Sequence, residues 1–311
     1  MKLIFAGTPA AAVPSLRRLV ADGHEVALVV TRPDAELGRK RILTPSAVAA
    51  AAEELGLPVL RTSKLDDEAT QLIGDLMPDL AVVVAYGAFV REPLLSIPVL
   101  GWINLHFSLL PRWRGAAPVQ RAIMAGDDTT GAAVFALEAG MDTGPVFGQF
   151  ERAIGRNQTA GHLLESLAED GAKLLADVVG QLSDGTAVSR PQIGEPSLAP
   201  KLTLEDGRID WGQPSDVVFA QLRGVTPEPG AFTTIDGARL KIGEAAIAWD
   251  VPALNAGAIE ERGGHVLVGT TSNPLRLIRV QPAGKTMMPA ADWWRGVTVP
   301  SLQADFGGWA S

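Results

Sequence analysis

Residues 1–31, MKLIFAGTPAAAVPSLRRLVADGHEVALVVT, set the pattern from which the fold of this chain can be predicted. An apolar run over residues 2–6 breaks at Gly-Thr-Pro, and a second apolar run covers residues 25–31. Continuous apolar runs are typical of strands buried on both faces of a parallel sheet. Between the two runs, apolar side chains recur at the spacing of an amphipathic helix, at Val13, Leu16, Leu19 and Val20. The stretch therefore predicts a strand, a helix and a second strand.

The same alternation continues along the chain. We expect helices over residues 45–55 and 66–76, a brief strand over 58–60, and the strongest strand of the chain over 79–85. Residues 32–44 are expected to form a polar, basic connection. The alternation predicts an α/β fold with an open, doubly wound and mostly parallel sheet.

The next segments complete this first domain. Residues 102–107 predict another strand, and residues 116–124 predict the helix after it. Two further strands over 131–137 and 145–153, joined by a tight segment, indicate an antiparallel edge. Residues 159–182 predict a long amphipathic helix.

The composition of the sequence changes near residue 183. Residues 183–208 are rich in proline and poor in apolar side chains, which predicts a linker. Short alternating runs follow, at residues 239–242, 265–268 and 275–280. They predict a small β-rich domain, a barrel, over 209–311, after a first domain over 1–182.

The composition excludes several kinds of functional site. The chain has no cysteine, which excludes disulfides, thiolate nucleophiles and Cys-based metal sites. Its four histidines lie far apart without metal-ligand spacing, so we expect no metal. No apolar run is long enough to cross a membrane, and no signal peptide is evident, so we expect no membrane association and a soluble, cytoplasmic protein.

Charge argues against general binding to nucleic acid. The net charge is −8, from 27 Lys and Arg against 35 Asp and Glu. One cluster, Arg39, Lys40 and Arg41, departs from this balance and could form a local phosphate-binding loop. A solvated surface loop is the more usual interpretation of such a cluster.

Two motifs could carry chemistry. Asn104 and His106 lie two residues apart on one predicted strand, so they project from the same face, at the carboxyl end where α/β sheets bind ligands. Asp142 lies between Gly140 and Gly144, whose freedom of backbone angle can aim the carboxylate inward.

An amide, an imidazole and a carboxylate suit the attack of an amine on a carbonyl carbon. Asn104 and protonated His106 would donate to the oxyanion, and Asp142 would favour the imidazolium and relay the proton. Each motif alone is also compatible with a structural pair or a stabilised turn.

One long string carries a resemblance. Residues 104–118, NLHFSLLPRWRGAAP, resemble the signature of the methionyl-tRNA formyltransferase family. Shorter matches cover both domains, at residues 5–9 (FAGTP), 84–87 (VAYG), 140–144 (GMDTG), 201–202 (KL), 208–211 (RIDW) and 281–285 (QPAGK). The catalytic Asn, His and Asp of folate-dependent formyltransferases match Asn104, His106 and Asp142.

The resemblance implies formyl transfer from 10-formyltetrahydrofolate to the α-amine of methionine on initiator tRNA, by a monomer active in translation initiation. It implies a Rossmann-type catalytic domain and an OB-like C-terminal domain that adds a basic surface for tRNA. The arginine of the family's tRNA-contacting loop matches Arg39, within the cluster that includes Lys40 and Arg41. The folate-binding segments of the family match Ser108, Leu109, Leu110 and Pro111, and, beside the pterin, Tyr86, Gly87, Ala88, Phe89 and Val90.

Two features depart from the family pattern. Phe107 stands where many relatives have glycine, and on the strand pattern it should face away from Asn104 and His106. Residues 201–311 hold 10 Lys and Arg against 12 Asp and Glu, which weakens the expected basic face.

Other activities are open to the same residues. A folate-dependent formyltransferase acting on a sugar nucleotide or glycinamide ribonucleotide, or a 10-formyltetrahydrofolate hydrolase, would share the three residues. A nicotinamide dehydrogenase would need a Gly-x-Gly-x-x-Gly turn, which Gly7-Thr8-Pro9 does not supply. A tRNA-binding module without catalysis is the alternative from a different class.

Overall fold

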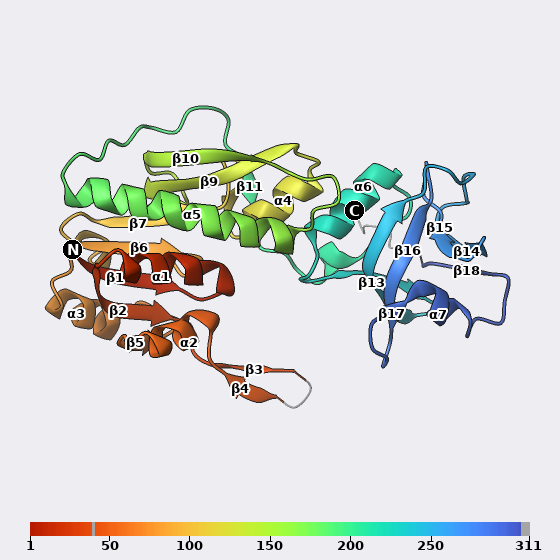
Figure 1. Cartoon of the computed structure of the whole chain (residues 1–311), viewed down its shortest axis with the longest axis horizontal. Helices are drawn as coiled ribbons and strands as arrows, with labels where there is room; N and C mark the ends of the chain where they lie inside the picture. The colour runs from red at the N-terminus through yellow and green to blue at the C-terminus, as the bar shows by residue number, and fades with distance from the viewer. Residues whose placement is uncertain (39–40, 306–311) are drawn as a thin grey trace. The chain divides into compact units, whose positions relative to one another are not determined.

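The computed structural model describes residues 1–38 and 41–305, which form two compact units (Figure 1). The first unit consists of Met1–Pro118, Thr129–Ala153 and Leu164–Pro200. The second consists of Val119–Asp128, Ile154–Leu163 and the chain from Lys201 onward. The domain boundaries expected at residues 182 and 209 stay predictions.

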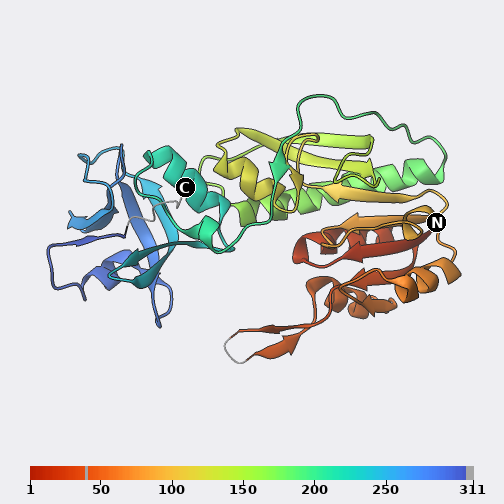
Figure 2. The same ribbon diagram turned by 180° about the vertical axis from the view of Figure 1, so that it is seen from behind.

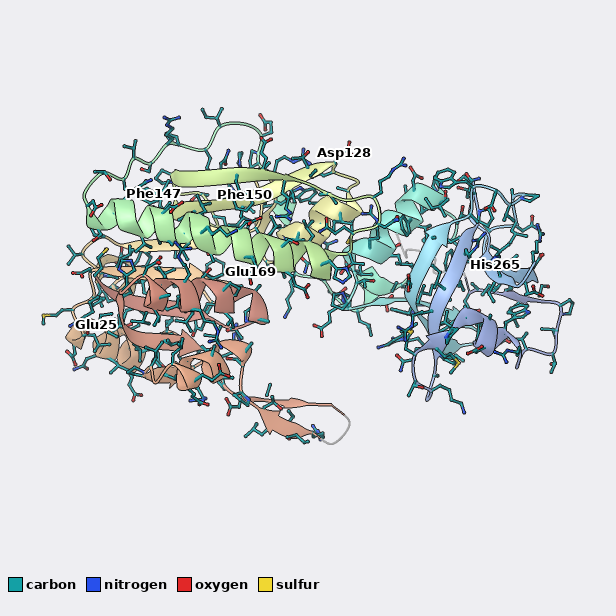
Figure 3. The ribbon with its side chains drawn as sticks, in the orientation of Figure 1. Glu25, Asp128, Phe147, Phe150, Glu169 and His265 are labelled. Atoms are coloured by element: carbon teal, nitrogen blue, oxygen red, sulfur yellow. The ribbon has the colours of Figure 1, made fainter. Side chains whose placement is uncertain are left out.

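A mixed sheet forms the core of the first unit, with the strand order β10-β9-β7-β6-β1-β2-β5. Its strands are β1 (Lys2–Gly7), β2 (Glu25–Thr31), β5 (Val59–Arg61), β6 (Leu80–Val84), β7 (Trp102–His106), β9 (Thr129–Ala136) and β10 (Val146–Ala153). From β7 to β5 all neighbours are parallel, whereas β9 and β10 are antiparallel. The doubly wound, mostly parallel sheet with an antiparallel edge is therefore confirmed. Figure 3 shows Phe147 and Phe150 on the outer strand β10, where both side chains are half-buried.

Helices cover this sheet. They are α1 (Val13–Ala21), α2 (Ala47–Glu54), α3 (Asp67–Asp75) and α5 (Ala160–Ser183), with α4 (Pro118–Met124) preceding β9. Local caps begin two of them: the Ser46 hydroxyl accepts the Ala49 N–H at 2.9 Å, and the Asp66 carboxylate accepts the Ala69 N–H at 3.2 Å. Such caps satisfy amide groups that the first helical turn leaves without partners.

The two faces of the sheet are packed differently. Ile4 and Trp102 belong to a buried cluster that includes Ile73 of α3. Leu105, on the opposite side of β7 from Trp102, packs against Gly171 of α5, the long helix that crosses the sheet in Figure 1. Even-numbered residues of β7 therefore share the face of Trp102, and α5 covers the other face.

The order of the strands creates a crevice. After β1 the chain adds β2 and β5 on one side, and it then places β6 and β7 on the other side. Loops that leave the carboxyl ends of β1 and β6 therefore diverge, which is where open α/β sheets bind ligands.

Residues 32–44, which we expected to form a polar, basic connection, contain a two-stranded antiparallel hairpin, β3 (Ala35–Leu37) and β4 (Ile42–Thr44). Figure 2 shows it as a separate ribbon beyond the sheet. Backbone pairing between Glu36 and Leu43 forms it, and the exposed Ile42 and Leu43 side chains bury no core. Periodicity cannot reveal strands that bury neither face.

The second unit contains an antiparallel sheet with the order β12-β13-β16-β15-β14-β18, and β17 pairs with β16. The strands are β12 (Ala231–Ile235), β13 (Ala238–Ile247), β14 (Ala258–Arg262), β15 (His265–Val268), β16 (Leu275–Pro282), β17 (Met288–Pro289) and β18 (Ser301–Gln303). The helices are α6 (Ser215–Gly224) and α7 (Ala290–Trp294). The Asp305 N–H donates to the Thr234 carbonyl at 2.8 Å, so the chain after β18 meets the opposite edge strand β12. The expected small β-rich domain is confirmed.

Candidate active site

Strand β7 places Asn104 and His106 on one face at its carboxyl end. Asn104 pairs with Val83 of β6 on one side and with Phe135 of β9 on the other. The His106 ring packs edge-on against Phe135, with the ring centroids 6.3 Å apart. The backbone that carries both polar side chains is thus fixed by strands on either side of β7. Their common face was predicted from their separation of two residues along the strand.

The Asn104 carboxamide has a buried atom without a partner. Its Oδ1 is shielded from solvent and accepts no hydrogen bond within residues 1–38 and 41–305. Buried polar atoms are nearly always hydrogen-bonded in folded proteins, because an unpaired one costs about 1–3 kcal/mol. Asn104 also lines a cavity, so a water or a ligand in that cavity is placed to supply the missing partner.

His106 is hydrogen-bonded at one ring nitrogen and lies near a carboxylate at the other. Its side chain is 6% exposed, its Nε2 lies 2.9 Å from the Trp113 carbonyl oxygen, and its Nδ1 lies 3.8 Å from Oδ2 of Asp142. A carbonyl can only accept, so a neutral ring carries its proton on Nε2 and keeps a lone pair on Nδ1.

The protonation state of the resting His106 ring follows from its burial. Burial lowers the pKa of His106, although Asp142 and the Trp113 carbonyl act in the opposite direction. The resting imidazole is therefore neutral at pH 7, and the donation to an oxyanion expected of protonated His106 requires a proton to arrive first. Its Nδ1 must first gain a proton.

The carboxylate is aimed by unusual backbone geometry. Asp142 itself has a φ of 51°, in the left-handed region, and its Oδ2 accepts the Gly115 N–H at 2.8 Å. We expected Gly140 and Gly144 to supply the unusual angles, but they serve close packing. A Cβ at Gly144 would lie 1.8 Å from the Ala136 carbonyl oxygen. The strained angle therefore falls on Asp142 itself, the residue that we expected to act as the carboxylate.

One cavity of about 580 Å³ brings these residues together. Asn104, His106 and Asp142 all line it, as does Pro9 after β1. The expected pterin segment also lines it, at Tyr86, Gly87, Ala88, Phe89 and Val90. The volume lies within the roughly 300–1,000 Å³ of small-molecule sites. The cavity occupies the crevice that the strand order predicts.

The loop after β6 is fixed from outside the cavity. Tyr86 is buried, and its hydroxyl donates to the Thr62 carbonyl at 2.9 Å. The Arg32 guanidinium donates to the Gly87 carbonyl. Phe89, by contrast, is 61% exposed and leaves an apolar surface at the cavity.

The second expected folate segment lies elsewhere. Leu109, Leu110 and Pro111 line a separate cavity of about 520 Å³, together with Arg112 and residues 193–197. Ser108 is fully buried, and its hydroxyl donates to the Arg112 carbonyl at 2.6 Å. Phe107 is buried and contributes to the wall of the first cavity.

The expected tRNA-binding cluster is described only in part. Arg39 and Lys40 lie outside the described residues. The side chain of Arg41 is 80% exposed, and its guanidinium pairs with the Glu36 carboxylate at 2.7 Å. Arg41 therefore presents a cation at the base of the hairpin tip.

Sequence reasoning missed two backbone groups that hold the site, the Trp113 carbonyl and the Gly115 N–H. Both lie within the long string at residues 104–118, but main-chain contacts leave no trace in residue type. No three His, Asp or Glu side chains cluster as metal ligands in the part of the chain that the structure describes. No helix in that part combines the length and the apolar character that a membrane crossing needs.

Comparison with protein families gives two matches. The model of the formyl transferase family matches residues 1–179, and that of the formyl transferase C-terminal domain matches residues 201–298. The chain is 64% identical to the methionyl-tRNA formyltransferase of Clavibacter sepedonicus, over 98% of this chain and 100% of that protein. It is 59% identical to the methionyl-tRNA formyltransferase of Leifsonia xyli subsp. xyli, over 95% of this chain and 97% of that protein.

Solved structures show the same fold at lower identity. An N-formyltransferase from Helicobacter canadensis, in complex with folinic acid and dTDP-3-aminofucose, has a TM-score of 0.67 and 17% identity, over 91% of this chain and 99% of that one. HypX from Aquifex aeolicus, in complex with tetrahydrofolic acid, has a TM-score of 0.65 and 15% identity, over 94% of this chain and 46% of that one.

Proposed function

Because the chain belongs to the methionyl-tRNA formyltransferase family, we propose that Asn104, His106 and Asp142 carry its reaction, formyl transfer from 10-formyltetrahydrofolate to the α-amine of methionine on initiator tRNA. The protein is a one-carbon transferase. The observation that carries the assignment of residues is the unpaired Asn104 Oδ1 in a cavity shared with His106 and Asp142.

Asn104 is suited to hold both reacting groups. Its NH₂ group can donate to the formyl oxygen, which gains negative charge as the amine attacks. Its unpaired Oδ1 can accept an N–H of that amine. The carboxamide would thus align the nucleophile with the carbon that it attacks.

His106 and Asp142 are suited to move the proton. The amine nitrogen bonds to the formyl carbon, and the surplus proton passes from that nitrogen to Nδ1 of His106. Oδ2 of Asp142, 3.8 Å from Nδ1, stabilises the resulting imidazolium. Nδ1–H can then donate to the oxyanion and deliver the proton to the folate nitrogen as its bond to the formyl carbon breaks. The products are a formylated amine and tetrahydrofolate.

The cavity is the site that we assign to the reduced folate. Tyr86–Val90, with the exposed Phe89 ring, line the cavity beside the three polar residues, which suits a flat ring system with polar edges. We assign the pterin to this loop. Ser108–Pro111 would then act by shaping the end of β7, since Leu109–Pro111 line the other cavity.

The tRNA partner is assigned to the hairpin tip and the second unit. Arg39, Lys40 and the exposed Arg41 give the hairpin a local positive charge in a chain whose net charge is −8. Few cations then carry the contact with phosphate, so binding should weaken as salt rises with a slope set by that small number of contacts. A monomeric state remains our expectation.

The test is an acceptor comparison. Wild-type protein is incubated with 10-formyltetrahydrofolate and either methionyl initiator tRNA or a dTDP-amino sugar, and formylated product is measured by mass spectrometry. We expect formylated product with methionyl initiator tRNA and none with the amino sugar. Product with the amino sugar alone would transfer the assignment to the sugar class, and tRNA binding without any product would indicate a binding module.

A further inference from the structure

A segment of the first unit, residues 190–199, spans both loops that form the candidate site; we call it the strap. At one end Arg190 exchanges two backbone hydrogen bonds with Val146, of 2.8 and 2.9 Å. At the other end β11 (Leu198–Ala199) pairs with β8 (Arg114–Gly115). The strap therefore joins the chain after Asp142 to the chain after His106.

The Gly115 side of this junction is tightly packed. The Ser197 hydroxyl accepts the Trp113 N–H at 2.9 Å, and the Ser197 carbonyl accepts the Arg114 N–H at 2.8 Å. A Cβ at Gly115, where φ is 123°, would lie 2.7 Å from the Ala199 carbonyl oxygen. The strap thus fixes the segment that supplies the Trp113 carbonyl to His106 and the Gly115 N–H to Asp142.

One strap side chain, Gln192, contacts both loops at once. Its Nε2 donates to the carbonyl oxygens of Asp142 and Gly144, each at 2.8 Å. Its Oε1 accepts from Nε and from a terminal NH₂ group of Arg114, at 3.2 and 2.7 Å. All four hydrogen bonds of this half-buried carboxamide are made with residues within or next to the candidate site.

We propose that Gln192 is a positioning residue, which holds the Asp142 backbone against the Arg114 segment and so sets the approach of the carboxylate to the His106 ring. The inference rests on the proposed function. Asp142 has a left-handed φ of 51°, a conformation that persists only where surrounding contacts over-determine it. Gln192 holds the backbone carbonyl of Asp142, and the Gly115 N–H holds its carboxylate. Together they fix both ends of this residue.

An isosteric substitution tests the proposal. Gln192→Met keeps the length of the side chain and removes every hydrogen bond of the carboxamide. The matched control is Gln221→Met, since Nε2 of Gln221 also donates to two carbonyls, of Asp206 and Arg208, at 2.9 and 2.8 Å in the second unit. Thermal unfolding, kcat, the KM for 10-formyltetrahydrofolate and the pH profile of kcat/KM are measured for both.

We expect kcat of Gln192→Met to fall by about ten- to a hundredfold, the cost of misplacing a catalytic group by up to about 1 Å. The KM for the folate should stay within about twofold, because Gln192 makes no ground-state contact in this assignment. The acidic limb of the kcat/KM profile should move to lower pH. When the Asp142 carboxylate moves away from His106, the imidazolium loses a stabilising charge and the pKa of His106 falls. Gln221→Met should lower Tm to a similar extent and leave kcat unchanged.

A second variant separates the two halves of the contact. Gln192→Glu keeps an acceptor for Arg114 but cannot donate to the Asp142 and Gly144 carbonyls, so it should match the kcat loss of Gln192→Met. Wild-type kcat in both Gln192 variants, or an equal kcat loss in Gln221→Met, would overturn the positioning role while wild-type formylation continued. Absence of formylation by the wild-type protein would instead overturn the proposed function.

Discussion

Nδ1 of His106 and Oδ2 of Asp142 lie 3.8 Å apart, although strand β7 carries the first residue and a loop 36 positions further along the chain carries the second. The gap exceeds a hydrogen bond of about 2.7–3.2 Å. It leaves the Nδ1 lone pair available while keeping the carboxylate close enough to stabilise a proton there. The pair is therefore arranged to receive a proton during the reaction, while the resting ring stays neutral.

Asn104→Ala should lower kcat/KM for formylation by about a hundredfold or more, as expected for loss of an oxyanion donor. Stability should change little, because the lost Oδ1 was already unpaired among the described residues. Steady-state kinetics and thermal unfolding measure the two effects. Near-normal turnover would remove Asn104 from the chemistry, and a large fall in Tm would make its role structural.

Stability should depend on pH through His106. Burial lowers the pKa of His106 below its ordinary 6.5, so the unfolded chain binds its proton more readily than the folded protein does. The stabilisation is present above about pH 6.5 and is lost as pH falls through the folded-state pKa. Urea unfolding at a series of pH values should therefore give a steeper acid decline for wild type than for His106→Gln.

His24 supplies the control for this experiment. Burial also lowers the pKa of His24, so it contributes a decline of the same sign from a site between the end of α1 and the start of β2. The His24→Gln background removes that contribution, and the difference attributable to His106 should persist in it. Equal slopes with and without His106 in this background would contradict a neutral, buried imidazole.

Much of this arrangement could be predicted from sequence, because strand periodicity is a local property. The strand predicted over residues 265–268 is observed as His265–Val268, and that predicted over 79–85 as Leu80–Val84. The shared face of Asn104 and His106 follows from the same period of two. By contrast, the neutral state of His106 depends on burial by distant segments, which no local pattern records.

Contacts to the main chain were the part of the site that sequence could not supply. Gln192 lies 50 positions from Asp142 and holds it through a carbonyl that every residue type carries. The hairpin of β3 and β4 escaped prediction for a related reason, since backbone pairing forms it while its Ile42 and Leu43 side chains stay exposed. The flanking glycines had singled out Asp142, and the resemblance then supported its grouping with Asn104 and His106.

Two glycine substitutions should have opposite effects on stability. Gly144→Ala would place a Cβ 1.8 Å from the Ala136 carbonyl oxygen, so the loop that carries Asp142 must shift. We expect a loss of about 1–3 kcal/mol in the free energy of unfolding, as for other overpacked sites, together with reduced turnover. Gly180→Ala, with no atom within 4 Å of its added Cβ in α5, should stabilise by roughly 0.4–1 kcal/mol. Urea unfolding measures both, and equal signs would contradict the packing argument.

Arg39→Ala should weaken the use of tRNA and leave folate binding intact, since the resemblance assigns this residue to the acceptor stem. Loss of one phosphate contact should raise the KM for initiator tRNA and reduce the slope of log KM against log salt by about one. Arg41→Ala is the comparison: its guanidinium is already paired with Glu36, so its removal should change the KM less. Formylation kinetics between low and moderate salt, with folate affinity measured by fluorescence, give these values. If folate affinity fell in step with tRNA use, the hairpin would be acting on the catalytic cavity, and its assignment to RNA would be wrong.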